Sequence, residues 1–128
     1  MDGVDQARLE RLNQAGIRSH RLLLSRAKDR RGRRQLAAET GICEALILRW
    51  ANMADLMRIR GIGQDYSELL QAGGVETVKD LRNRNPGRLA AALSAVNAQQ
   101  RLVREAPGEK RVANWIAQAK QLPIVITH

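Results

Sequence analysis

Apolar residues recur along the chain at helical spacing, in short segments separated by glycine, proline or helix-capping residues. The clearest segment begins near Cys43 and ends at about Met57. Within it, Leu46, Trp50, Met53 and Met57 fall on one face of a helix. The spacing predicts a long amphipathic helix with Trp50 in the core.

Three shorter helices are predicted before it. The first covers about Asp5–Gln14 and ends at Gly16, because glycine readily takes the left-handed conformation that closes a helix. Ser19 is a suitable N-cap for the second. The third covers about Arg33–Glu39, and we expect the arginine-rich run Arg30–Arg34, which contains Gly32, to interrupt the helical pattern as a loop.

The second half of the chain has the same rhythm. Gly61-Ile62-Gly63 predicts a tight turn, and the helix after it stops at Gly73-Gly74. Thr77 can cap a short helix, and Asn85-Pro86 is a strong start for the next one, since proline fits the first helical position. Pro107 is expected to open the last helix.

These segments predict an all-α fold, a compact bundle of short helices. Aromatic residues make up only 2% of the chain, which disfavours a β-sandwich or barrel. A faint internal repeat pairs Leu12–Ile17 with Leu70–Val75, and Trp50–Ala54 with Trp115–Ala119. Each half would then hold one tryptophan in its core.

The expected organisation is therefore one helical domain built from two pseudo-repeated, helix-hairpin-helix-like units. The domain spans residues 1–128, the units cover about 5–58 and 59–122, and 123–128 form an extended C-terminal tail. We expect this tail to pack on the body of the protein, with a short strand as one interpretation.

Charge adds a functional indication. Lys and Arg number 22 against 13 Asp and Glu, so the formal net charge is +9. Such an excess favours a polyanionic partner, although a solvated basic surface would also explain it. The run Arg30, Arg31, Arg33 and Arg34 is the densest cluster, and arginine suits bidentate phosphate contact. It contains no aromatic residue, so stacking on bases is not expected there.

The segment Leu56–Leu70 resembles a helix-hairpin-helix element, with an apolar pair, a Gly-apolar-Gly triplet and an amphipathic helix. Gly61 would let the chain reverse direction, and Ile62 would pack between the helices. Gly63 would leave backbone N–H groups open at the start of the next helix, where a phosphate can bind.

The charges around this turn are mixed. Asp65 and Glu68 follow it and would repel a phosphate, while Arg58 and Arg60 precede it and partly offset them. A hairpin that only packs two helices together is therefore an open alternative.

The chain from about Leu12 onward resembles one bacterial family of uncharacterised helical domains that contain helix-hairpin-helix elements. The resemblance lies in residues 47–63, 72–81, 84–86 and 115–119. It implies a helical fold of this size. It implies no particular biochemical activity.

Residues 36–47 also fit a helix-turn-helix, with Gly41 at the turn. A base-reading helix needs donors on its outer face, and the following helix offers only Arg49 and Asn52. A second, degenerate hairpin with Gly41-Ile42 at its tip is the favoured interpretation.

Catalytic and metal-binding patterns are missing from the sequence. One cysteine and two histidines do not make a zinc site, and Cys43 is expected to be a small buried residue. Glycosylases with helix-hairpin-helix elements need a catalytic Asp or Lys, and Lys79 and Asp80 match only by residue type. We therefore expect no enzymatic activity, no cofactor and no metal.

The sequence also bears on location. The acidic start Met1–Asp5 is unlike a secretory signal, and no apolar stretch is long enough to span a membrane, so we expect a cytoplasmic protein.

The leading hypothesis is a non-enzymatic module that binds DNA or RNA backbone without reading sequence. Its contact residues would be Arg58, Arg60, Gly61, Ile62 and Gly63 at the hairpin, with Arg30, Arg31, Arg33 and Arg34 in the loop. A protein-interaction or scaffold domain is the alternative. The oligomeric state stays open.

Overall fold

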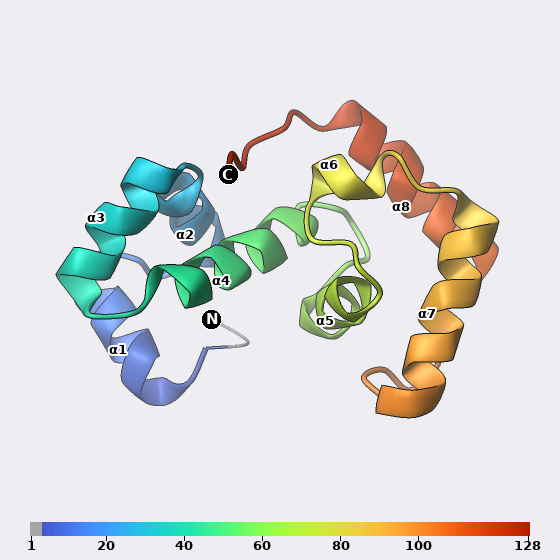
Figure 1. Cartoon of the computed structure of the whole chain (residues 1–128), viewed down its shortest axis with the longest axis horizontal. Helices are drawn as coiled ribbons and strands as arrows, with labels where there is room; N and C mark the ends of the chain where they lie inside the picture. The colour runs from blue at the N-terminus through green and yellow to red at the C-terminus, as the bar shows by residue number, and fades with distance from the viewer. Residues whose placement is uncertain (1–3) are drawn as a thin grey trace. The chain divides into compact units, whose positions relative to one another are not determined.

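A computed structural model describes residues 4–128, and within that range the chain forms eight α-helices and no strand (Figure 1). Residues 1–3 of the acidic start lie outside the described residues. The helices are α1 (Gln6–Gln14), α2 (His20–Ala27), α3 (Arg30–Thr40), α4 (Glu44–Leu56), α5 (Gln64–Ala72), α6 (Val78–Leu81), α7 (Pro86–Gln100) and α8 (Glu109–Gln121). The all-α prediction is confirmed.

The chain divides into two compact units. The first runs to Asp55 and includes Val125–His128, and the second covers Leu56–Ile124. Each unit has its own hydrophobic core. Trp50 lies in the core of the first unit and Trp115 in that of the second, with 5% and 1% of their surfaces exposed. Both tryptophans are thus core residues, as predicted.

Local capping explains where most helices begin. The Ser19 hydroxyl accepts a hydrogen bond from the Leu22 N–H at 3.2 Å, and so caps α2. The Asn85 side chain accepts one from the Arg88 N–H at 3.1 Å at the start of α7. Both starts agree with the sequence prediction. The last helix was predicted to begin at Pro107. Helix α8 begins two residues later, at Glu109, with Gly108 as its N-cap.

The arginine-rich run is helical, so the prediction of a loop there was wrong. Helix α3 begins at Arg30, because the Asp29 carboxylate caps it by accepting a hydrogen bond from the Gly32 N–H at 2.7 Å. Gly32 suggested a break, but it serves close packing of α2 and α3. A Cβ atom on Gly32 would lie 2.0 Å from the carbonyl oxygen of Arg26.

Replacing Gly32 with alanine should therefore destabilise the protein, even though alanine favours helix formation. A backbone carbonyl cannot rotate away as a side chain can, so α2 and α3 would have to move apart. We expect a loss of about 1–3 kcal/mol in the free energy of unfolding, as in overpacked cores. Urea unfolding measures it, with Ala38→Gly on the exposed part of α3 as a comparison. A stabilised Gly32→Ala variant would contradict the close contact.

Four turns in the described residues share one feature, a left-handed glycine followed by a buried aliphatic residue. The pairs are Gly16-Ile17, Gly41-Ile42, Gly61-Ile62 and Gly74-Val75. The two segments that the sequence paired also contain equivalent backbone hydrogen bonds, each 2.8 Å long. In the first, the Ile17 N–H donates to the Leu12 carbonyl, and in the second, the Val75 N–H donates to the Leu70 carbonyl. The wider repeat of the two units stays a prediction.

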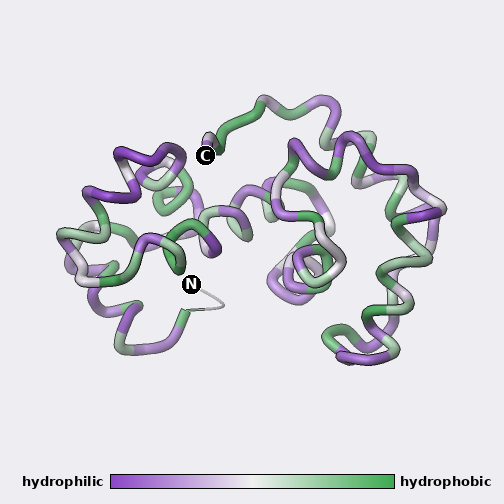
Figure 2. The backbone as a smooth tube through the Cα atoms, viewed as in Figure 1, coloured by the Kyte–Doolittle hydropathy of each residue, from purple (hydrophilic) through white to green (hydrophobic). Residues whose placement is uncertain are grey.

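The C-terminal tail, whose hydrophobic run is green in Figure 2, is extended and neither helix nor strand. Ile126 is only 5% exposed and belongs to the core of the first unit. The Thr127 N–H donates to the Lys28 carbonyl at 2.8 Å. The packed extended tail is confirmed, whereas the short-strand interpretation is wrong.

None of the helices in residues 4–128 has both the length and the apolar character needed to cross a bilayer.

Candidate nucleic-acid interface

The first turns of α3 concentrate positive charge. Arg30 and Arg31 are exposed, and the Arg34 side chain is 68% exposed. The N-terminal end of a helix already carries a positive partial charge, so cations there are destabilising. Arg30 and Arg34 are also four residues apart, where like charges repel. This end of α3 is a surface that a bound anion would stabilise.

Arg33 differs from its neighbours because it points into the protein. Its side chain is 5% exposed, with Nη1 donating to the Ala27 carbonyl at 3.0 Å and Nη2 to the Thr127 carbonyl at 2.9 Å. Burial lowers the pKa of the Arg33 guanidinium, and the nearby Asp29 carboxylate opposes that shift. Arg33 therefore holds the end of α2 and the tail, and it is not a surface contact.

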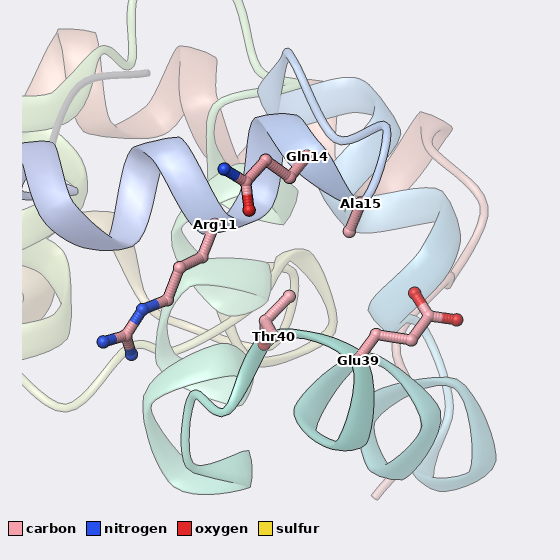
Figure 3. Close-up of a pocket in the computed structure, with 5 residues that line it drawn as sticks. All are labelled: Arg11, Gln14, Ala15, Glu39 and Thr40. Atoms are coloured by element: carbon pink, nitrogen blue, oxygen red, sulfur yellow. The ribbon is translucent and has the colours of Figure 1, made fainter.

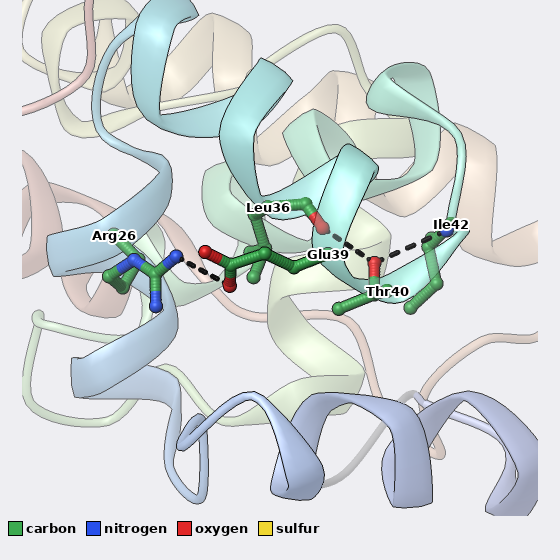
Figure 4. A network of polar contacts seen from close by, with 5 residues as sticks. All are labelled: Arg26, Leu36, Glu39, Thr40 and Ile42. Atoms are coloured by element: carbon green, nitrogen blue, oxygen red, sulfur yellow. Dashed lines mark hydrogen bonds and ion pairs between the residues drawn. The ribbon is translucent and has the colours of Figure 1, made fainter.

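Ion pairs offset little of this charge. Arg34 Nε lies 3.8 Å from Glu44 Oε1, and Arg26 Nη2 lies 3.0 Å from Glu39 Oε2 (Figure 4). Both pairs are at least one-third exposed, and surface pairs contribute about 0–1 kcal/mol. A phosphate could replace Glu44 beside Arg34 at small cost.

The turn between α4 and α5 has the local geometry that its sequence predicted. Gly61 is left-handed at φ +96°, and Ile62 is 4% exposed in the core of the second unit. A Cβ atom on Gly61 would lie 3.2 Å from Trp115 Nε1, whereas one on Gly63 would meet nothing within 4 Å. The space on the Cβ side of Gly63, just before α5, is therefore open.

The two arginines before this turn have different environments. Arg58 is half-buried, and its Nη2 donates to the Pro123 carbonyl at 2.9 Å. Arg60 is exposed, while its backbone N–H and carbonyl pair with the Gln118 amide at 2.9 and 3.1 Å. Of the two, only Arg60 presents an exposed side chain.

A cavity of about 460 Å³ lies against this turn. Its lining residues are Gly61, Gly63, Asp65, Tyr66, Val103, Arg104 and Glu105. The lining thus contains two acidic residues, Asp65 and Glu105, and one basic residue, Arg104. The lining is net negative and opposes phosphate binding. Sequence reasoning missed Arg104 and Glu105 because only the fold brings them to the turn.

Tyr66 is the one aromatic residue in that lining, and its position is fixed. Its ring makes an edge-to-face contact with Trp115, with centroids 5.1 Å apart. Arg111 Nη1 donates to the Tyr66 hydroxyl at 2.7 Å, and its Cζ lies 5.8 Å from the ring centroid. The core and Arg111 together hold Tyr66 in place.

One known family covers nearly the whole chain. The model of DUF4332, a domain of unknown function, matches residues 2–122. The chain belongs to this family. No curated protein and no solved structure matches the chain. Family membership assigns no activity to the chain.

In this DUF4332 domain, the residues that fitted a helix-turn-helix offer few base-reading groups. Gly41 is left-handed and Ile42 is buried, so a turn connects α3 and α4. Asn52, one of the two expected donors, is 5% exposed and thus buried. Cys43 is exposed, so its predicted burial was wrong, because it precedes the first residue of α4.

A further cavity of about 350 Å³ in the first unit is lined by Arg11, Gln14, Ala15, Glu39 and Thr40 (Figure 3). Glu39 pairs with Arg26, and the Thr40 hydroxyl donates to the Leu36 carbonyl and accepts from the Ile42 N–H (Figure 4). These polar groups already stabilise the end of α3.

Residues with other candidate chemistry also have structural partners. Asp80 accepts hydrogen bonds from the Glu76 and Thr77 N–H groups at 3.2 and 3.3 Å, and so caps α6. Lys79 is exposed. Across residues 4–128, no cluster of three or more His, Cys, Asp or Glu side chains could hold a metal ion.

Proposed function

We propose that this DUF4332 domain is a non-enzymatic module that binds nucleic-acid backbone without reading base sequence. Net charge does not indicate which unit binds nucleic acid, because the first unit has 11 basic and 7 acidic residues and the second has 11 basic and 6 acidic residues. The observation that carries the proposal is the placement of Arg30, Arg31 and Arg34 at the start of α3. That placement is unfavourable for the helix alone, and phosphate would compensate for it.

The exposed contacts are fewer than the sequence suggested. Arg33 and Arg58 donate to backbone carbonyls, which leaves Arg30, Arg31, Arg34 and Arg60. Four phosphate contacts on duplex DNA predict a slope of about −3.6 for log affinity against log salt concentration. Fluorescence anisotropy with labelled duplex DNA, single-stranded DNA and RNA tests this. A slope near zero contradicts the proposal.

The turn at Gly61–Gly63 is proposed as a weaker second contact, in a helix-hairpin-helix element. The open space beside Gly63 and the exposed Arg60 support this role. The carboxylates of Asp65 and Glu105 limit its affinity for phosphate.

Replacing Asp65 with asparagine should strengthen binding if this turn contacts phosphate. Removal of one nearby carboxylate is expected to raise duplex affinity about two- to fivefold at 50 mM salt. Glu10→Gln on exposed α1 makes the same change in net charge away from the turn and serves as the control. Equal effects of the two variants would show that the turn makes no contact.

A protein partner is the second candidate, and the net-negative cavity at the turn favours it for the second unit. A basic peptide segment would complement Asp65 and Glu105. In that case Asp65→Asn would leave nucleic-acid affinity unchanged, and charge removal from α3 would not alter partner binding.

A further inference from the structure

A small cavity of about 200 Å³ lies in the first unit, where α3, α4 and the C-terminal tail meet. Its lining residues are Arg30, Arg33, Glu44, Ala45, Leu48 and His128. The cavity thus combines two guanidinium groups with an apolar wall and an imidazole.

Arg33 gives this cavity a buried positive charge that forms no close ion pair among the described residues, although the carboxylates of Asp29 and Glu44 act on it from farther away. The side chain is 5% exposed, and its Nη atoms donate to the neutral carbonyls of Ala27 and Thr127. None of the ion pairs among residues 4–128 involves Arg33. Buried charges are normally paired, so an anion bound in the cavity would supply the close partner that Arg33 does not have.

The rest of the lining also favours an anion. Arg30 adds a second guanidinium from the same helix. Glu44 contributes one opposing carboxylate, but that group lies 3.8 Å from Arg34 Nε, which offsets part of its charge. The charged side chains of the lining therefore sum to one net positive charge.

Size and charge narrow the ligand class. The cavity is smaller than the roughly 300–1,000 Å³ of sites for drug-sized molecules, so it suits a single tetrahedral anion with water. A phosphate monoester carries a charge near −2 at pH 7 and is attached on one side only, whereas an internal phosphodiester is attached on both. We propose that this cavity binds a phosphate monoester, namely the terminal phosphate of a nucleic-acid strand. The source of the phosphate rests on the proposed function, whereas the site itself does not.

Titration of the full chain with inorganic phosphate tests the site, with backbone amide NMR shifts as the readout. We expect saturable shifts at Leu48 and His128, with binding weakened about fivefold or more in Arg30→Gln. Arg21→Gln removes the same charge from an exposed position of α2, outside the lining, and should bind phosphate like the wild type. Glu44→Gln should bind about two- to threefold tighter. Absence of saturable shifts, or equal loss in both arginine variants, overturns the site.

Oligonucleotides with a 5′-phosphate, a 3′-phosphate or neither test the source. The wild type should bind one phosphorylated form about tenfold tighter than the unphosphorylated strand, and Arg30→Gln should lose this preference. Equal binding of all three strands overturns the strand-end assignment while leaving backbone binding intact. If no strand binds, the proposed function fails, and the phosphate titration still decides the site.

Discussion

Replacing Arg30, Arg31 and Arg34 together with glutamine should weaken nucleic-acid binding and stabilise the protein at the same time. Three lost phosphate contacts lower the salt slope by about 2.7, which corresponds to about 500-fold weaker duplex binding at 0.1 M salt relative to a 1 M reference. Helix α3 becomes more stable, because two positive charges are removed from its N-terminal turn and the repulsion between Arg30 and Arg34 is lost. We expect about 1 kcal/mol of added stability by thermal unfolding.

A matched variant separates this effect from a general loss of charge. Lys79, Arg88 and Lys120 are exposed in the second unit, and their replacement by glutamine removes the same total charge. This control should lose about tenfold in affinity or less, through long-range electrostatics alone. Equal losses of nucleic-acid affinity in the two triple variants would mean that α3 does not contact the nucleic acid specifically. A destabilised α3 variant would contradict the argument from the helix end.

Replacing Arg33 with methionine should have the opposite effect on stability. Methionine fills similar space but donates no hydrogen bond, so the carbonyls of Ala27 and Thr127 lose their charged donor. We expect a loss of about 2–4 kcal/mol in the free energy of unfolding, measured with urea. Hydrogen exchange at the Thr127 amide should also become faster, because the tail is held by the same side chain.

Arg31→Met is the control for this variant, since Arg31 is exposed in the same helix. Its stability should stay within about 0.5 kcal/mol of the wild type or rise slightly. Similar stabilities for the Arg33 and Arg31 variants would contradict the structural role of Arg33.

Sequence patterns were sufficient where local chemistry decides the structure. Ser19 and Asn85 mark helix starts because their side chains bond to N–H groups three residues ahead. Gly32 misled because its role is tertiary: it lets the carbonyl of Arg26 approach closely, which no local signal reveals. The Asp29 cap of α3 is as local a signal as Ser19 and Asn85, but the glycine and the dense positive charge after it favoured a loop.

The sequence predicted the residue types of the candidate site better than the positions of their side chains. The arginine run was visible, but the inward direction of Arg33 depends on the carbonyl of Thr127, which is 94 residues away in the chain. Arg104 and Glu105 reach the Gly61 turn only through the fold, so their charges could not enter the sequence argument. Long-range contacts thus remove Arg33 from the exposed cations and make the surroundings of the Gly61 turn acidic.

The salt dependence of duplex binding, compared between the wild type and the α3 triple variant, tests the central claim most directly. The wild type should give a slope of about −3.6 and the variant about −0.9, because three of four phosphate contacts are removed. Parallel lines with the same slope would contradict the claim that α3 contacts the phosphate backbone.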